Sequence, residues 1–268
     1  MTAIPPKPYI FDEAQHDTEL ARLQALECVF DAATQRCLST LRVAPGFRCL
    51  EVGAGAGSIA KWLSKTVGAS GHVTALDLNT RFLTQPLPEN LEVLEADIRT
   101  APLAPASFDL VHARFVLIHV PAWGEALAAL FRALKPGGCI LLEEPDFSAA
   151  RAFSGPTELQ AAFTNVHHAI ETMFRARGMD YAFGARLPAL FVEQGLQHVS
   201  FENDAAIVPG SSAHARMMSA STRQLADKYI ATGHASHSDI ERYSEFAANP
   251  DCLAIYHATL RAMAQKPA

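Results

Sequence analysis

The sequence predicts an α/β protein with a mostly parallel sheet that helices cover on both faces. Short and almost continuously apolar runs alternate with longer segments whose apolar residues recur at helical spacing. Strands of this kind are typical of a parallel sheet that is buried on both sides. Glycine-rich turns separate the segments, and K-P-G-G at 135–138 is the clearest of them.

The expected elements follow one another along the chain. An arm with three prolines (1–8) precedes one or two helices within 12–41. Strands are expected at 47–52, 72–78, 91–97, 108–115 and 139–144, with helices between them at 58–67 and 124–134. After Asp146 we expect helices at 157–177, 185–194, 212–231 and 238–247, and one strand-like segment at 198–208.

This order divides the chain into three regions. Residues 1–41 are expected to form the N-terminal arm and cap helices, and 42–150 the ligand-binding core. Residues 151–268 are expected to form a helical substrate-binding insertion and tail, which also supplies the last strands of the core.

The composition limits the partners and the compartment. With 49% hydrophobic and 19% charged residues the chain can bury a substantial core. A net charge of -6 without a dense basic run argues against a nucleic-acid partner. Five scattered cysteines without a C-x-x-C pair indicate neither a disulfide framework nor a zinc ribbon. Because there is no signal-peptide pattern and no apolar stretch of membrane-spanning length, we expect a cytoplasmic protein without a membrane partner.

A glycine-rich turn follows the first strand. Gly53, Gly55 and Gly57 permit a tight turn, close approach of the backbone to a ligand, and direct entry into a helix whose amides point at that ligand. Such turns also serve NAD and FAD. However, the dinucleotide pattern G-x-G-x-x-G requires glycine at position 58, where this chain has Ser58, and Glu51 stands two residues before the first glycine.

The next strand should supply a carboxylate for both hydroxyls of a ribose, since an acceptor-only group pairs well with a vicinal diol. Asp77 stands at its end, twenty residues after Gly57. An acid at a strand end is also common as a solvated loop residue or a helix cap. Its spacing from the glycine-rich turn favours the binding role.

The whole pattern resembles the class I S-adenosylmethionine (SAM) dependent methyltransferases, and in particular the ubiquinone-biosynthesis-type and actinobacterial small-molecule enzymes. Five ordered segments within 47–146 carry the resemblance: E-x-G-x-G-x-G, the strand that ends at Asp77, A-D-I at 96–98, F-D-L-V-H-A-R-F, and L-K-P-G-G-C-I-L-L-E-E. It implies a Rossmann-like sheet of seven strands, mostly parallel, with N-terminal and C-terminal helical caps. The last strand would be antiparallel and come from 253–263, a segment that looks as helical as extended.

The resemblance also implies SAM as the cofactor, S-adenosylhomocysteine as its product, and a set of binding residues. Asp97 would bind the adenine amino group, and the adjacent backbone amide the ring. Arg114 stands where the carboxylate tail of the cofactor could lie, although a surface ion pair is an equal alternative. The residues expected to bind the cofactor are Glu51, Gly53, Ala54, Gly55, Gly57, Asp77, Leu78, Asp97, Ile98, His112 and Arg114.

An alcohol or phenol acceptor would benefit from a general base, which histidine commonly supplies. The catalytic candidates are His119, His167 and His168, while His112 is a further histidine near the site. For His119, a structural role at the pocket floor fits the sequence at least as well as catalysis. His167 and His168 are adjacent, so only one of them can point into a cleft, and the alternative for them is a pair exposed to solvent. Phe115 and Trp123 could face the sulfonium, although such aromatics are more often core residues.

We expect a methyltransferase that acts on a small, apolar acceptor within secondary metabolism, at oxygen first and then at carbon or nitrogen. We expect a monomer or a homodimer. H-A-S-H-S-D (234–239) lacks a third ligand and E-E-P-D (143–146) the remaining ones, so no metal is assigned. The N/D-P-P-Y pattern of base-amine methyltransferases is absent after the fourth strand. The alternatives are a SAM-binding regulator or non-methylating catalyst, an NAD-dependent oxidoreductase, and a plain interaction module.

Overall fold

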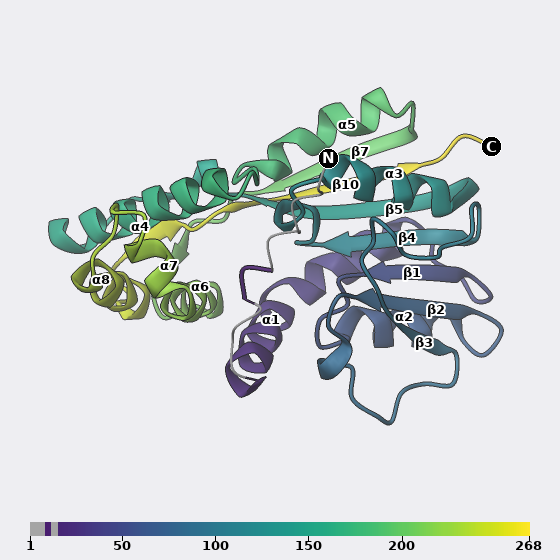
Figure 1. Cartoon of the computed structure of the whole chain (residues 1–268), viewed down its shortest axis with the longest axis horizontal. Coiled ribbons are helices and arrows are strands. Elements are labelled where there is room, and N and C mark those ends of the chain that lie inside the picture. Colours follow the sequence, from purple (N-terminus) through teal and green to yellow (C-terminus); the bar gives the residue numbers. More distant parts are fainter. Residues whose placement is uncertain (1–8, 12–15) are drawn as a thin grey trace, which may run out of the picture.

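The computed structural model describes residues 9–11 and 16–268, and the expected arm (1–8) lies outside them. The central sheet has seven strands in the order β3-β2-β1-β4-β5-β10-β7 (Figure 1). Their bounds are β1 Arg48–Val52, β2 His72–Asp77, β3 Leu91–Glu95, β4 Phe108–Arg114, β5 Leu134–Asp146, β7 Gln197–Asp204 and β10 Ala258–Gln265. Strand β10 runs antiparallel to both of its neighbours, β5 and β7. The seven-stranded, mostly parallel Rossmann-like sheet with an antiparallel last strand is therefore confirmed.

The described helices are α1 His16–Thr40, α2 Ser58–Val67, α3 Trp123–Ala133, α4 Thr157–Ala176, α5 Leu187–Glu193, α6 Ala213–Gln224, α7 Ala226–Ile230 and α8 His237–Ala248. Short 3-10 turns lie at η1 Thr80–Phe82, η2 Leu117–His119, η3 Phe147–Ala149 and η4 Phe183–Arg186. No helix in these parts of the chain is long and apolar enough to cross a membrane.

Helices cover both faces of the sheet, which explains why its strands are apolar on both sides. Successive residues of β5 show this, because their side chains point to opposite faces of the sheet. Leu141 belongs to the buried cluster that contains Leu38 of α1 and Leu63 of α2. The next residue, Leu142, belongs to the other cluster, together with Leu130 of α3 and residues of α5. The inner strands β1, β2, β4, β5 and β10 thus bury both of their faces, whereas the edge strands β3 and β7 are partly exposed.

The helices α4, α6, α7 and α8 gather at one end of the sheet, and α1 lies between them and α2 (Figure 1). The ring of Phe163 on α4 packs against the rings of Tyr243 and Phe246 on α8 and against that of Tyr256. These contacts join α4 to α8. The side chains that point from these helices toward the strand ends are therefore held by a packed aromatic cluster.

Three details differ from the sequence-based expectations. The K-P-G-G segment at 135–138, expected as a turn before a strand at 139–144, lies within β5, which begins at Leu134. The helix expected at 212–231 is divided at Leu225 into α6 and α7. The segment expected as one strand at 253–263 begins as β9 Leu253–Ile255, which pairs with β6 Arg151–Ala152 and β8 Val208–Pro209 in a small second sheet, and only then continues as β10. Pairing with residues far away in the sequence decided the last of these details.

Candidate functional site

The glycine-rich turn requires glycine at its fixed positions. Gly53, Gly55 and Gly57 have φ angles of 69°, 56° and 90°, in the left-handed region that side chains disfavour. A Cβ atom on Gly53 would overlap Cγ2 of Val116, and one on Gly57 would lie 2.7 Å from Cδ2 of Leu83. The backbone therefore forms an open cradle that no other residue type would leave in place.

Asp77 at the end of β2 binds the glycine-rich turn. Its Oδ2 accepts a hydrogen bond from Gly55 N at 2.9 Å, and its Oδ1 accepts one from Asn79 N at 3.0 Å. Burial raises the pKa of this carboxyl, and the backbone donors act in the opposite direction. Each oxygen keeps a further acceptor position, so the carboxylate suits a pair of hydroxyls.

Residues that follow β2 and β3 contribute to the same wall. Leu78 is 60% exposed although it is large and apolar, and it lines the cavity described below. Asp97 and Ile98 line it too, and the guanidinium of Arg99 binds the Asp97 carboxylate and lowers its pKa. An adenine amino group at this position would share the carboxylate with Arg99, a residue that was not among the predicted site residues.

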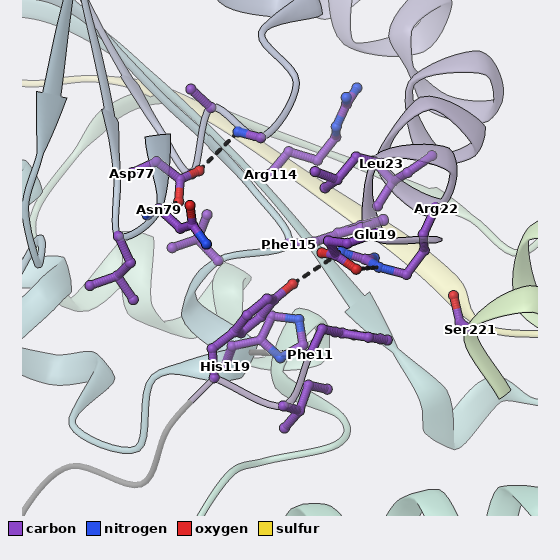
Figure 2. Close-up of a pocket in the computed structure, with 18 of the residues that line it drawn as sticks. Phe11, Glu19, Arg22, Leu23, Asp77, Asn79, Arg114, Phe115, His119 and Ser221 are labelled. Atoms are coloured by element: carbon purple, nitrogen blue, oxygen red, sulfur yellow. Dashed lines mark hydrogen bonds and ion pairs between the residues drawn. The ribbon is translucent and has the colours of Figure 1, made fainter. Parts of the chain in front are cut away.

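A cavity of about 500 Å³ extends from the glycine-rich turn to the helical part of the molecule. Figure 2 shows Asp77 and Asn79 at one side of it and Phe11 and His119 at another, with Glu19 and Arg22 reaching in from α1. Its far half is mostly apolar and is lined by Phe115, Phe147, Ile170, Phe174, Met217, Met218, Leu225 and Tyr229. The cavity thus joins a polar nucleoside-sized end to an apolar chamber.

His119, on η2, forms part of the chamber wall. Its Nδ1 is buried and has no hydrogen-bond partner among the described residues. Its ring packs edge-on against Tyr9, with 5.3 Å between ring centroids. Burial, reinforced by the charge of Arg22, lowers the pKa of His119 to about 3, so the imidazole is neutral at physiological pH.

Glu144 fixes the turn that carries His119. Its carboxylate accepts hydrogen bonds from the backbone N–H groups of Val116 at 3.1 Å, Leu117 at 2.7 Å and Ile118 at 3.2 Å. Burial raises the pKa of Glu144 to about 8 against the lowering effect of these donors. Because Val116 also covers Gly53, one buried carboxyl couples the glycine-rich turn to the chamber wall.

Residues 9–11 close the cavity near α1. The guanidinium of Arg22 donates to Tyr9 Oη at 3.1 Å and lies 4.0 Å from the centroid of the Phe11 ring. Glu19 binds the same guanidinium at 2.8 and 2.6 Å. Tyr9, Phe11, Glu19 and Arg22 all line the cavity, and none of them was a predicted site residue.

The structure places His112 differently from the sequence-based expectation, because it does not line the cavity. The ring is fully buried between two acids, with Nδ1 2.6 Å from Glu51 and Nε2 3.0 Å from Glu143. Burial alone would lower the pKa of His112, but the two carboxylates outweigh it and raise the pKa to about 9. The prediction that His112 contacts the cofactor is therefore wrong, because its ring lies between the two acids and not at the cavity. Glu51 itself lines the cavity.

Arg114 does line the cavity, but its guanidinium is already engaged. It donates to Asp31 at 2.9 Å and to Thr34 at 2.8 Å, both on α1. Gly53, Ala54 and Gly55 line the cavity as expected. Gly57 shapes the turn beside them.

Neither His167 nor His168 lines the cavity. His167 packs against Phe163 with 4.4 Å between ring centroids. Both of its ring nitrogens are buried and find no partner in the described parts of the chain, and burial lowers the pKa of His167 to about 3. His168 is exposed. One and two turns of α4 farther on, Ile170 and Phe174 take the cavity-lining positions.

The remaining candidates have structural roles. Trp123 packs on Phe183 at 5.4 Å between centroids, outside the cavity wall. In the H-A-S-H-S-D segment, Ser236 and Asp239 form the capping box of α8. Within residues 9–11 and 16–268, no group of His, Cys, Asp and Glu could hold a metal ion.

Part of the chain is similar to proteins of a known family. Residues 50–142 match the model of a family described as a methyltransferase domain. The chain is 37% identical over 108 residues to the ubiquinone/menaquinone biosynthesis C-methyltransferase UbiE of Brucella anthropi, which is 37% of this chain and 41% of that protein. The chain spans less than half the length of the curated relatives it matches first.

Two solved structures share the fold over almost the whole chain. The phosphoethanolamine N-methyltransferase 2 of Haemonchus contortus, in complex with phosphomonomethylethanolamine and S-adenosylhomocysteine, has a TM-score of 0.60 at 18% identity, with 97% of this chain and 59% of that chain covered. The [4+2]-cyclase SpnF has a TM-score of 0.60 at 17% identity, with 98% of both chains covered. At these identities the likeness concerns the fold. Residues 50–142 are therefore similar to a methyltransferase domain, and the whole chain has a fold that methyltransferase structures share.

Proposed function

We propose that this protein transfers a methyl group from SAM to a small, apolar acceptor, with a hydroxyl oxygen as the first choice, carbon as the second and nitrogen as the third. The observation that carries the proposal is the single cavity that joins the glycine-rich turn to an apolar chamber. A donor and an acceptor held in such a cavity lie in contact and away from water, and positioning of this kind supplies much of the catalysis of a displacement reaction.

The residues at the polar end fit SAM. Asp77 would bind the ribose hydroxyls, and Leu78 and Ile98 offer apolar surface to the adenine. Asp97 would accept a hydrogen bond from the adenine amino group, and Glu51 would face the amino-acid tail. The glycines leave room that a Cβ atom would fill. When bound, SAM supplies an activated methyl group on a sulfonium.

The chamber fits an aromatic or aliphatic acceptor that carries a hydroxyl. Its wall of Phe115, Phe147, Phe174, Met217 and Met218 would bind apolar surface. His119 is the proton acceptor of the proposal, because its buried Nδ1 has no hydrogen-bond partner among the described residues. The imidazole is a weak base, but the acceptor hydroxyl becomes strongly acidic as the new oxygen–carbon bond forms and the sulfur–carbon bond breaks. Its proton then passes to His119 and from there to water.

The proposed roles of the three regions follow from the cavity lining. Region 42–150 would bind the donor, because the turn and the acids at the strand ends belong to it. Regions 1–41 and 151–268 would define the acceptor, because α4, α6 and α7 supply most of the chamber wall and α1 lines the cavity beside it. Acceptor specificity would then depend on the helical regions, where Met217 and Met218 provide an adaptable surface.

The test is a transfer assay with SAM that carries a deuterated methyl group. The protein is incubated with a panel of phenols, apolar alcohols, quinols and amines, and mass spectrometry follows both S-adenosylhomocysteine and the labelled product. We expect labelled ether from at least one hydroxyl acceptor and less product from His119→Gln. Labelled product from carbon or nitrogen acceptors alone would correct the order of acceptors. SAM binding without S-adenosylhomocysteine from any acceptor would favour a regulator or a non-methylating catalyst.

A further inference from the structure

A row of charged side chains crosses the buried middle of the sheet on the face that α1 covers. Glu51 on β1 lies opposite His112 on β4, and Glu143 on β5 lies opposite Arg261 on β10. Acids and bases alternate along the row. None of these four residues is more than 4% exposed.

Short contacts connect the members of this row. His112 bridges Glu51 and Glu143 through its two ring nitrogens, at 2.6 and 3.0 Å. Nε of Arg261 donates to Oε2 of Glu143 at 2.8 Å, and Oγ1 of Thr34 donates to its Oε1 at 2.6 Å. Because a ring that donates from both nitrogens is an imidazolium, the geometry fits a positive charge held between two carboxylates.

At the cavity, the row ends in Oε1 of Glu51. Oε2 of Glu51 pairs with His112, whereas no residue in the described parts of the chain donates to Oε1. Glu51 lines the cavity next to Gly53. At the other end of the row, Arg261 reaches the half-exposed Asp204. The cavity-side oxygen of Glu51 is thus the position at which a ligand could join the row.

Stability alone gives little reason for such a row. Buried ion pairs lose their hydration, and well-packed apolar residues can often replace them without loss of stability. Leu141, on the same face of β5 and two residues before Glu143, shows that apolar packing suits this surface. What apolar residues cannot provide is an ionised carboxylate with one orientation at the cavity.

We propose that His112 and Glu143 are positioning residues that hold the Glu51 carboxylate in place for the ammonium group of a ligand's amino-acid tail. The inference rests on the proposed function, because SAM and S-adenosylhomocysteine carry that ammonium group. His112 donates to one oxygen of Glu51 and leaves the other for the ligand, and Glu143 keeps the imidazolium charged and fixes the plane of its ring. Neither residue touches the ligand.

The test compares two ligands that differ in the tail. S-adenosylhomocysteine carries the amino-acid tail, whereas 5′-methylthioadenosine has the same adenosine and thioether without it. For His112→Asn we expect the affinity for S-adenosylhomocysteine to fall at least tenfold and that for 5′-methylthioadenosine to change less than twofold, both measured by calorimetric titration. His72→Asn is the matched control, because His72 is a strand histidine paired with an acid, Glu92, outside the cavity.

A second variant and a mutant cycle complete the test. Glu143→Gln keeps the shape of the row and removes one charge, so we expect the same tail-specific loss at smaller size, and it replaces His112→Asn if that variant does not fold. In a Glu51→Gln background, His112→Asn should cause almost no further loss, because its effect passes through Glu51.

The possible outcomes separate the two proposals. Equal losses for both ligands, no loss for either, or a full additional loss in the Glu51→Gln background would overturn the positioning role while leaving the proposed function intact. Wild-type protein that binds neither ligand would overturn the proposed function and this inference with it.

Discussion

Asp77 offers the sharpest single-residue prediction for the donor site. In Asp77→Ala the ribose would lose hydrogen bonds to a charged acceptor, and such bonds contribute about 1.5 to 3 kcal/mol. The affinity for SAM should therefore fall roughly 10- to 150-fold. The variant also removes the acceptor of Gly55 N, so part of the loss would come from a less ordered glycine-rich turn.

The folded state should tolerate the loss of this charge. Burial raises the pKa of Asp77, so the ionised group opposes folding at pH values above its ordinary pKa, and the opposition disappears only when acid protonates it. Asp77→Asn removes the charge and keeps one carbonyl acceptor. We expect it to leave the melting temperature of the ligand-free protein unchanged or higher while it lowers the affinity for SAM.

The assay is calorimetric titration of SAM into folded variants, with melting curves recorded beside it. Asp109→Ala is the matched control, because Asp109 also accepts a backbone N–H, that of Arg48 at 2.8 Å, but lies outside the cavity. It should bind SAM as the wild type does. Unchanged affinity in a folded Asp77→Ala variant, or an equal loss in Asp109→Ala, would refute the ribose assignment.

Three further predictions concern the turn, the chamber wall and the helical part. Gly57 has a φ of 90°, and a Cβ atom on it would lie 2.7 Å from Cδ2 of Leu83. Gly57→Ala should therefore lower the unfolding free energy by about 1 to 2 kcal/mol and weaken SAM binding. A normal unfolding free energy in denaturation and a normal affinity in titration would contradict the role of this turn. Glu144→Gln loses an acceptor for the η2 amides, so turnover should fall at least tenfold with little change in SAM affinity, and steady-state kinetics that show the reverse would contradict its role. His167 has a pKa of about 3 in the folded protein, so below about pH 6.5 it binds a proton in the unfolded chain only and lowers the unfolding free energy. Between pH 7.5 and 5, His167→Phe should therefore lose about 2 kcal/mol less of its unfolding free energy than the wild type, and it should keep normal turnover. Loss of turnover in that variant would instead support a catalytic His167.

The order of elements was predictable because it depends on local patterns. Apolar runs, helical spacing and glycine turns act within a few residues, and they located all seven strands of the main sheet, although β10 comes from a segment that looked equally helical. The small second sheet was not predictable, since it pairs Arg151 with Ile255, about a hundred positions away. The division of the chain at 41 and 150 stays a prediction.

The site was predictable where the backbone itself forms it. Gly53 and Asp77 occupy the expected positions because a strand followed by a tight turn leaves few alternatives. His112 was misassigned because spacing does not show whether a strand residue contacts the ligand or a neighbouring strand. A signal was nevertheless present, since Glu51 and Glu143 are acids inside otherwise apolar strands and therefore require a partner.

The acceptor side depends on contacts that no local pattern reveals. Tyr9 and Arg22 meet across 13 positions, and Glu144 meets Leu117 across 27. These contacts decide which side chains surround the chamber, so sequence spacing predicted His119 there and also suggested His167, which lies against α8 instead.

The central claim is that the glycine-rich turn and Asp77 bind SAM rather than a dinucleotide. Parallel calorimetric titrations of the purified protein with SAM and with NADH test it most directly. The structure predicts saturable binding of one SAM per chain and no heat of binding for NADH. Saturable NADH binding without SAM binding would contradict the claim.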